Sequence, residues 1–175
     1  MKRICFHGAE STGKSVLAAK LAAELGLPWV PEYGREYAET HGTEFTLPDL
    51  LAIAAGHEER VQLLEAQGAE LALLDTDPLM TAAWTEMLFD QAPEELFAYP
   101  KADLYLLFEP DVPWIEDGTR FFGTTEERAR FAALAEEMLR RAEVPFERIG
   151  GTWANREAQV RQVLAGFQGR VTATT

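Results

Sequence analysis

Cysteine is almost absent from this chain of 175 residues, because Cys5 is the only one. A single cysteine excludes an internal disulfide, which favours a cytoplasmic protein over a secreted one. The sequence also lacks any hydrophobic run long enough to cross a membrane. Glycines and charged residues interrupt its first residues at once, so we expect no signal peptide and no membrane partner.

Basic residues are scarce as well: 16 Lys and Arg stand against 29 Asp and Glu, giving a net charge of −13. Because clusters of Lys and Arg hold nucleic-acid phosphates, we expect no nucleic-acid partner. Repeats, low-complexity tracts and metal-type Cys/His clusters do not stand out. The length and the 47% hydrophobic content predict one domain over residues 1–170, followed by a frayed tail over 171–175.

What the sequence does contain is Gly-Ala-Glu-Ser-Thr-Gly-Lys-Ser at residues 8–15. This run follows a short apolar strand at 3–7 and precedes an Ala/Leu-rich helix at 16–25, the context that a phosphate-binding P-loop requires. Backbone N–H groups of such a loop wrap a phosphate chain, Lys14 reaches the β- and γ-phosphates, and the Ser15 hydroxyl binds Mg²⁺. We predict ATP and Mg²⁺ as cofactors, with cofactor contacts from Gly8, Glu10, Ser11, Thr12, Gly13, Lys14, Ser15 and Val16.

A second acidic site follows the apolar run at residues 70–74, which ends in Asp75-Thr76-Asp77. A buried strand that delivers a carboxylate to the phosphate and metal region is typical of P-loop proteins. We predict Asp75 as a Mg²⁺ ligand. If the strand continues as far as Asp77, alternation places Asp75 and Asp77 on one side and Thr76 on the other.

Residues 32–37 contain three charges and two tyrosines directly after a short strand at 29–31. The carboxyl ends of parallel strands line the ligand crevice of an open sheet, so we predict that Glu32, Tyr33 and Arg35 contact the substrate. A solvated turn with partly packed tyrosines is the alternative.

The remaining pattern alternates helices and strands. We expect helices at 46–67, 78–90, 93–97, 125–141 and from residue 155 onward, and strands at 102–108 and 145–149. This alternation predicts an α/β protein with the P-loop NTPase fold: a central, mostly parallel five-stranded sheet flanked by helices, with a small lid.

The lid is expected at about residues 112–130. Small P-loop kinases close an arginine-bearing lid over ATP, because the transferring phosphoryl group needs cations and the exclusion of water. Arg120 is the first choice for that cation and Arg128 the second. An exposed connecting loop is the alternative.

Taken together, residues 8–15, 32–36, 56–57, 75–77 and 114–120 resemble the ribosylnicotinamide kinase domain of NadR-type proteins, in the same order along the chain. The resemblance implies ATP-dependent phosphorylation of the ribose 5′-hydroxyl of nicotinamide riboside. Larger members carry an adenylyltransferase domain before the kinase, and we expect only the kinase half here. Members place an aromatic residue at the position of Pro31, where it can stack on the pyridine ring; Trp29, Tyr33 or Trp84 are candidates to replace it.

We therefore predict in-line transfer of the ATP γ-phosphoryl group to a sugar hydroxyl. A carboxylate must orient that hydroxyl and accept its proton; Asp77 and Glu32 are both candidates, with Asp77 favoured. The predicted catalytic residues are Lys14, Asp77, Glu32 and Arg120, and the predicted substrate contacts are Glu32, Tyr33, Arg35, Asp75, Asp77, Trp84, Trp114 and Asp117.

Two alternatives remain open at this point. One is a kinase of another nucleoside or small metabolite, and the other is a regulatory nucleotide-binding switch. A switch that reads guanine requires an Asn/Thr-Lys-x-Asp segment, which the chain does not contain. The expected partners are ATP and a small nucleoside-like substrate, and the sequence leaves open whether the protein forms a homo-oligomer.

Overall fold

A computed structural model gives the structure of residues 1–114 and 121–172. The strands are β1 (Lys2–His7), β2 (Trp29–Val30), β3 (Leu71–Asp75), β4 (Leu104–Phe108) and β5 (Phe146–Ile149). The helices are α1 (Lys14–Leu25), α2 (Tyr33–His41), α3 (Leu47–Ala66), α4 (Pro78–Phe89), α5 (Glu94–Ala98), α6 (Thr125–Arg141) and α7 (Trp153–Thr172).

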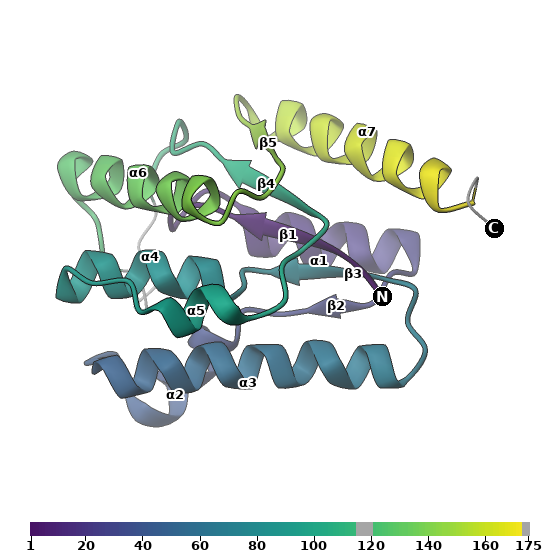
Figure 1. Cartoon of the computed structure of the whole chain (residues 1–175). Coiled ribbons are helices and arrows are strands. Elements are labelled where there is room, and N and C mark those ends of the chain that lie inside the picture. The colour runs from purple at the N-terminus through teal and green to yellow at the C-terminus, as the bar shows by residue number, and fades with distance from the viewer. Residues whose placement is uncertain (115–120, 173–175) are drawn as a thin grey trace.

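The five strands form one sheet in the order β2-β3-β1-β4-β5, and every neighbouring pair is parallel (Figure 1). The chain moves to one side of β1 for β3 and to the other side for β4. In open α/β sheets such a reversal leaves a crevice beyond the carboxyl end of the central strand, where ligands bind. The predicted α/β fold with a five-stranded parallel sheet is confirmed.

The two faces of the sheet follow from the alternation of side chains along the strands. Ile4 and Phe6 of β1 point toward α1 and α7, and they form one core with Leu21 and Leu164. Cys5, between them, points to the opposite face, where α3, α4, α5 and α6 build the second core. Because both faces are covered, β3 is apolar up to Asp75 and β4 is apolar throughout, as the sequence pattern predicted for residues 102–108.

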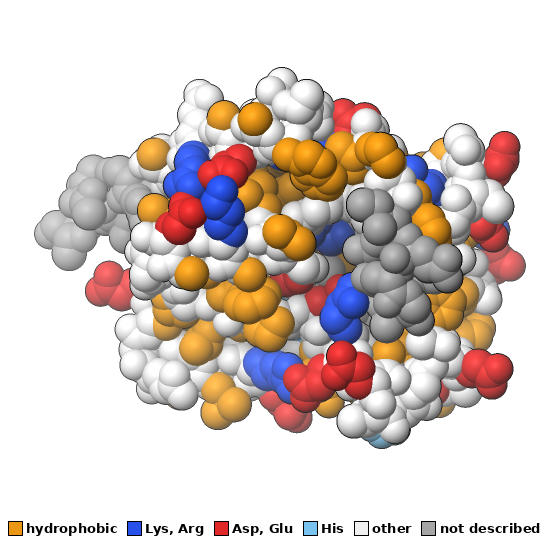
Figure 2. All heavy atoms as spheres, turned by 180° about the vertical axis from the view of Figure 1, so that it is seen from behind, with side chains coloured by type: hydrophobic (Ala, Val, Ile, Leu, Met, Phe, Trp, Pro, Cys, Tyr) orange, Lys and Arg blue, Asp and Glu red, His pale blue; other side chains and the backbone are white. Residues whose placement is uncertain are grey.

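The surface seen from behind the view of Figure 1 carries acidic and basic side chains interspersed with hydrophobic ones, around a recess near its centre (Figure 2). On this face the excess negative charge of the chain is therefore not gathered into one patch. None of the helices in the described part of the chain is long and apolar enough to cross a membrane.

Helix α2 is the element that the sequence analysis missed. Residues 33–41 form a helix, where we expected a charged segment or a turn. Its only buried residue is Ala38, so the hydrophobic pattern of the segment is weak. The helix is supported instead by contacts one turn apart and across helices: the rings of Tyr37 and His41 stack at 4.0 Å, and Tyr37 donates to Asp49 at 2.7 Å.

A buried arginine joins the carboxyl ends of three strands. Arg156 of α7 is 1% exposed. It donates to the backbone carbonyls of Thr12 after β1, Glu109 after β4 and Ile149 at the end of β5. It also pairs with Asp111. The planar guanidinium supplies donors in several directions at once, which a lysine ammonium on a flexible stem does not.

We expect Arg156→Lys to lower the melting temperature by about 5–10 °C, because buried carbonyls lose their donors while the charge remains. Thermal unfolding followed by circular dichroism measures this. The control is Arg161→Lys in the same helix, whose side chain is 39% exposed in its ion pair with Glu157; it should shift the melting temperature by less than about 2 °C. Equal shifts in the two variants would contradict the cross-linking role.

Candidate active site

The turn between β1 and α1 requires glycine at both ends. Gly8 has φ of 127° and Gly13 has φ of 86°, values that residues with side chains rarely adopt. A Cβ atom at Gly8 would lie 2.7 Å from the carbonyl oxygen of Phe108, and one at Gly13 would overlap with the ring of Trp153. Gly13 is the N-cap of α1 and brings no capping side chain. The first N–H groups of α1 therefore remain available to an anion.

The turn is closed by bonds to one carbonyl. Lys14 Nζ and the Thr12 hydroxyl both donate to the oxygen of Ala9, at 2.8 Å and 2.9 Å. Lys14 is buried in this position. Burial raises the pKa of Glu10, and the positive charge of Lys14 opposes that rise, so the ammonium acts on the other charged groups of the turn. A phosphate chain lying there meets backbone donors and a cation together.

Asp75 ends β3 as a buried carboxylate next to this turn. The Ser15 hydroxyl bonds to the carboxylate, and Asp75 Oδ1 has no hydrogen-bond partner among the described residues. Burial, followed by the negative charge of Glu32, raises the pKa of Asp75 from 3.8 to about 6. A hydroxyl beside a carboxylate with an unused oxygen offers the hard oxygen ligands that Mg²⁺ prefers. Ser15 and Asp75 therefore fit the magnesium ion predicted for them.

The extended conformation on which a common side for Asp75 and Asp77 depended does not continue to Asp77. Thr76 has φ of 71°, so the chain leaves the extended conformation directly after Asp75. Asp75 pairs in register with Phe6, which faces α1 and α7, whereas Asp77 accepts a hydrogen bond at 2.5 Å from Tyr105, which faces the opposite core. The other oxygen of Asp77 accepts from the N–H groups of Leu79 and Met80 and caps α4. Both oxygens are thus used internally.

A pocket of about 300 Å³ opens from the P-loop. Among the predicted site residues, its wall contains Gly8, Glu10, Ser11, Thr12, Gly13, Lys14, Ser15, Val16, Glu32, Arg35 and Trp84. Another part of its wall is apolar and aromatic, with Ala38, Phe45, Leu50, Ile53, Met80, Phe121 and Phe131. The pocket thus combines an anion-binding loop, a carboxylate, a guanidinium and an aromatic wall.

Glu10 joins the P-loop to the described part of the predicted lid region. Its carboxylate accepts hydrogen bonds from the backbone N–H groups of Phe121 and Phe122, at 3.1 Å and 3.2 Å. The Phe121 ring lies 5.3 Å from that of Trp84 and 5.9 Å from that of Phe45. Glu10 therefore positions part of the aromatic wall, a contact that the sequence pattern did not predict.

The other predicted residues lie outside the pocket wall or outside the described residues. Tyr33 packs on Gly56 with Arg60 over its ring, and Trp114 lies against Gly123. Arg128 donates to the carbonyls of Pro110 and Val112 at the start of the predicted lid. The predictions for Asp117 and Arg120 fall on residues 115–120, outside the described part of the chain.

Trp153 is a candidate residue that the sequence analysis missed. It is 54% exposed although its ring covers Gly13 of the P-loop, and the buried Arg156 guanidinium lies 5.8 Å from the ring. An exposed tryptophan directly beside a phosphate-binding turn offers a flat surface to a nucleotide base. The residue lies 140 positions after Gly13, and no local pattern links the two.

A parallel sheet with a P-loop after its central strand, and with a buried acid at the tip of the next strand, defines a P-loop protein built to bind a nucleotide. Comparison with protein families matches residues 3–156 to the family described as an AAA domain. The chain belongs to this family.

Curated relatives agree with the resemblance noted from the sequence. The trifunctional NAD biosynthesis/regulator protein NadR of Escherichia coli is 33% identical over 159 residues, which cover 85% of this chain and 38% of that protein. NadR of Salmonella typhimurium is 33% identical over 156 residues, covering 83% and 37%. The chain thus spans less than two fifths of the length of these relatives.

Solved structures share the fold. A NadR protein in complex with NR superposes with a TM-score of 0.75 at 22% identity, over 93% of this chain and 50% of that one. NadR with NAD and AMP-PNP gives 0.72 at 21% identity, over 96% and 49%. Thymidylate kinase from Candida albicans gives 0.71 at 18% identity, over 95% and 92%.

We expect Asp75→Asn to raise the melting temperature at pH 7.5 by about 3–6 °C, because it removes a buried charge. The pKa of Asp75 is raised on folding, so the charge costs nothing below pH 3.8 and its full amount above pH 6. The advantage of the variant should therefore grow between pH 4 and pH 6 and then stay constant. Thermal unfolding of both proteins across this range measures it.

Asp90→Asn is the matched control, since its side chain is 85% exposed. It should change the melting temperature little at any of these pH values. A destabilised Asp75→Asn protein at pH 7.5 would show instead that the carboxylate is needed for folding.

Proposed function

We propose that the protein is an ATP-dependent kinase that phosphorylates the ribose 5′-hydroxyl of nicotinamide riboside to give nicotinamide mononucleotide. The observation that carries the proposal is the pocket itself, which joins a phosphate-binding turn to an aromatic wall by way of Glu32 and Arg35. Support comes from the NadR relatives at 33% identity and from the shared fold of a NadR protein in complex with NR.

The phosphate end of the reaction belongs to the P-loop. Backbone N–H groups at the start of α1 and Lys14 bind the β- and γ-phosphates of ATP and offset the charge that spreads over the transferring group. Ser15 and Asp75 would hold Mg²⁺, which neutralises phosphate charge when bound. Asp75 is already buried and aimed at Ser15, so its carboxylate needs no reorganisation to serve as a ligand.

We assign the proton acceptor to Glu32 in place of Asp77. Glu32 lines the pocket and precedes α2 without a capping bond from its side chain, so that its carboxylate is not committed to the helix. Its negative charge adds to the burial that raises the pKa of both Asp75 and Glu10, which supports a place for Glu32 close to both carboxylates. A carboxylate there can orient the 5′-hydroxyl and accept its proton during transfer. Arg35 beside it, and Arg120 from the lid, stabilise the transferring charge.

The aromatic wall suits the acceptor base. Phe121 contacts both Trp84 and Phe45, and all three rings line the pocket, while Glu10 and Glu32 contribute negative charge to the same space. A pyridinium ring gains both from aromatic faces and from nearby carboxylates. We propose that Trp84 and Phe121 supply the stacking surface that other family members place at the position of Pro31.

The adenine base of ATP needs a binding surface beside the P-loop that is separate from the aromatic wall. We propose that Trp153, which covers Gly13 and remains half exposed, forms one wall for the adenine of ATP. Its stacking is independent of the base's hydrogen-bonding edge, so it contributes affinity without selecting ATP over GTP.

Glu32→Gln should lower kcat by about 10²- to 10⁴-fold, because the amide cannot accept the proton, while KM for ATP stays within about threefold. The control is Glu36→Gln in the helix that follows Glu32: Glu36 pairs with Arg60 at the surface, and its loss should change kcat less than twofold. If the Glu32→Gln enzyme keeps a normal kcat and a folded Asp77→Asn enzyme loses about 10²- to 10⁴-fold in kcat, the proton acceptor is Asp77.

The acceptor is tested by ADP release from Mg²⁺–ATP in the presence of single ribosides. We expect kcat/KM for nicotinamide riboside to exceed that for adenosine, uridine and thymidine by at least about tenfold, since only its base carries a positive charge. Dihydronicotinamide riboside, which is uncharged, is the matched control and should fall between them. Faster turnover of an uncharged nucleoside would make the protein a kinase of that nucleoside. ADP release that no acceptor stimulates would favour a nucleotide switch.

A further inference from the structure

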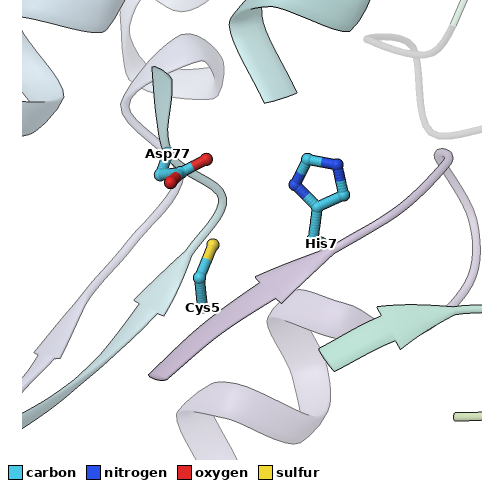
Figure 3. A group of neighbouring side chains, drawn as sticks. All are labelled: Cys5, His7 and Asp77. Carbon is cyan, nitrogen blue, oxygen red and sulfur yellow. The ribbon is translucent and has the colours of Figure 1, made fainter. Parts of the chain in front are cut away.

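Three chemically reactive side chains converge beneath the pocket. Cys5 and His7 lie two positions apart on β1, and Asp77 begins α4. One ligand atom from each lies within 4.8 Å of the others, and all three residues are buried. Figure 3 shows the thiol, the imidazole and the carboxylate pointing toward a common space. The spacing along the sequence gave no sign of this group, because Asp77 reaches it only through the turn at Thr76.

The imidazole is held in one tautomer. His7 Nε2 lies 2.9 Å from the carbonyl oxygen of Ala135 in α6, and since a carbonyl only accepts, Nε2 carries the proton. The lone pair is therefore on Nδ1, which is buried and has no hydrogen-bond partner among the described residues. In metal sites the second ring nitrogen of a histidine ligand almost always donates to a carbonyl or carboxylate in this way.

The carboxylate is held equally firmly. Asp77 Oδ1 accepts from both Leu79 and Met80, and Oδ2 accepts from Tyr105, so the group is fixed at the start of α4 and the second lone pair of Oδ2 is still available. The Cys5 side chain comes from β1, two positions before His7, and its thiol points toward the same space as the imidazole and the carboxylate (Figure 3). Thiolate, imidazole and carboxylate are the three kinds of ligand that zinc sites in proteins use.

We propose that Cys5, His7 and Asp77 form a structural site for a zinc-class divalent cation, which ties β1 to the start of α4. The ion replaces the thiol proton of Cys5, which goes to solvent, and it meets the charges of one thiolate and one carboxylate with its own two positive charges. A fourth position is filled by water or by the Tyr105 oxygen, which lies 2.5 Å from Asp77.

The dimensions are close to those required. An ion among three atoms that lie within 4.8 Å of one another is at most about 2.8 Å from each, and zinc bonds of about 2.0–2.3 Å then require each donor to move inward by no more than roughly 0.5–0.8 Å. None of the three residues lines the pocket, so the site is separate from the proposed Mg²⁺ ligands Ser15 and Asp75. The proposal does not depend on the identity of the substrate.

Cobalt is the probe that tests it, because Co²⁺ bound to a thiolate gives a charge-transfer absorption and Cys5 is the only cysteine of the chain. The full-length chain is stripped with a chelator, refolded with Co²⁺ because every donor is buried, and then titrated with Zn²⁺. We expect one equivalent of cobalt with the charge-transfer band, displacement of the band by Zn²⁺, and a higher melting temperature with Zn²⁺ than without it.

Variants locate the ion. Cys5→Ser should abolish the band and the thermal shift, and His7→Asn should weaken Co²⁺ binding at least tenfold. His57→Asn is the control, because it changes a different buried histidine, which lies in α3. It should leave both the charge-transfer band and the thermal shift unchanged. Circular dichroism shows that each variant is folded. A wild-type protein without the band, or a Cys5→Ser protein with an unchanged Zn²⁺-dependent thermal shift, overturns the proposal and leaves the space to a water molecule.

Discussion

A buried carboxylate beside a phosphate-binding turn is the constraint on which the rest of this structure depends. Asp75 is carried to the tip of β3, where burial disfavours its charge, and the Ser15 hydroxyl and the Lys14 charge only partly offset that cost. A cation brought by a nucleotide offsets more of it. The buried charge of Asp75 is therefore destabilising by itself, and the proposed cation would offset that cost, as is often found at functional sites.

The surrounding architecture keeps this arrangement in place. Gly8 allows the P-loop to lie against Phe108 of β4, and Arg156 ties the ends of β1, β4 and β5 together from behind. On the opposite face, Asp77 fixes the start of α4 beneath the pocket. Glu10 then connects the P-loop to the aromatic wall through the N–H groups of Phe121 and Phe122. The P-loop and the aromatic wall are thus parts of one framework.

Local patterns predicted much of this framework. The P-loop, the acid at the tip of β3 and the alternation of strands with helices all depend on neighbours within a few residues, and each appears where the sequence placed it. Helix α2 was missed because its stability comes from the Tyr37–His41 stack and the Tyr37–Asp49 bond and not from a hydrophobic stripe. Asp77 was placed on the wrong side because a single left-handed residue, Thr76, ends the alternation. Trp153 and Arg156 reach the P-loop across more than a hundred residues, and periodicity carries no signal for such contacts.

The central claim is that Glu32 presents the acceptor hydroxyl to a γ-phosphate held by residues 8–15. The most direct measurement is a crystal structure of the protein with Mg²⁺, a non-hydrolysable ATP analogue and nicotinamide riboside. We predict the phosphates on the P-loop, the ribose 5′-oxygen about 3 Å from the Glu32 carboxylate, and the pyridinium ring against Trp84. A riboside whose 5′-oxygen lies away from Glu32, or phosphates bound outside residues 8–15, would contradict the account.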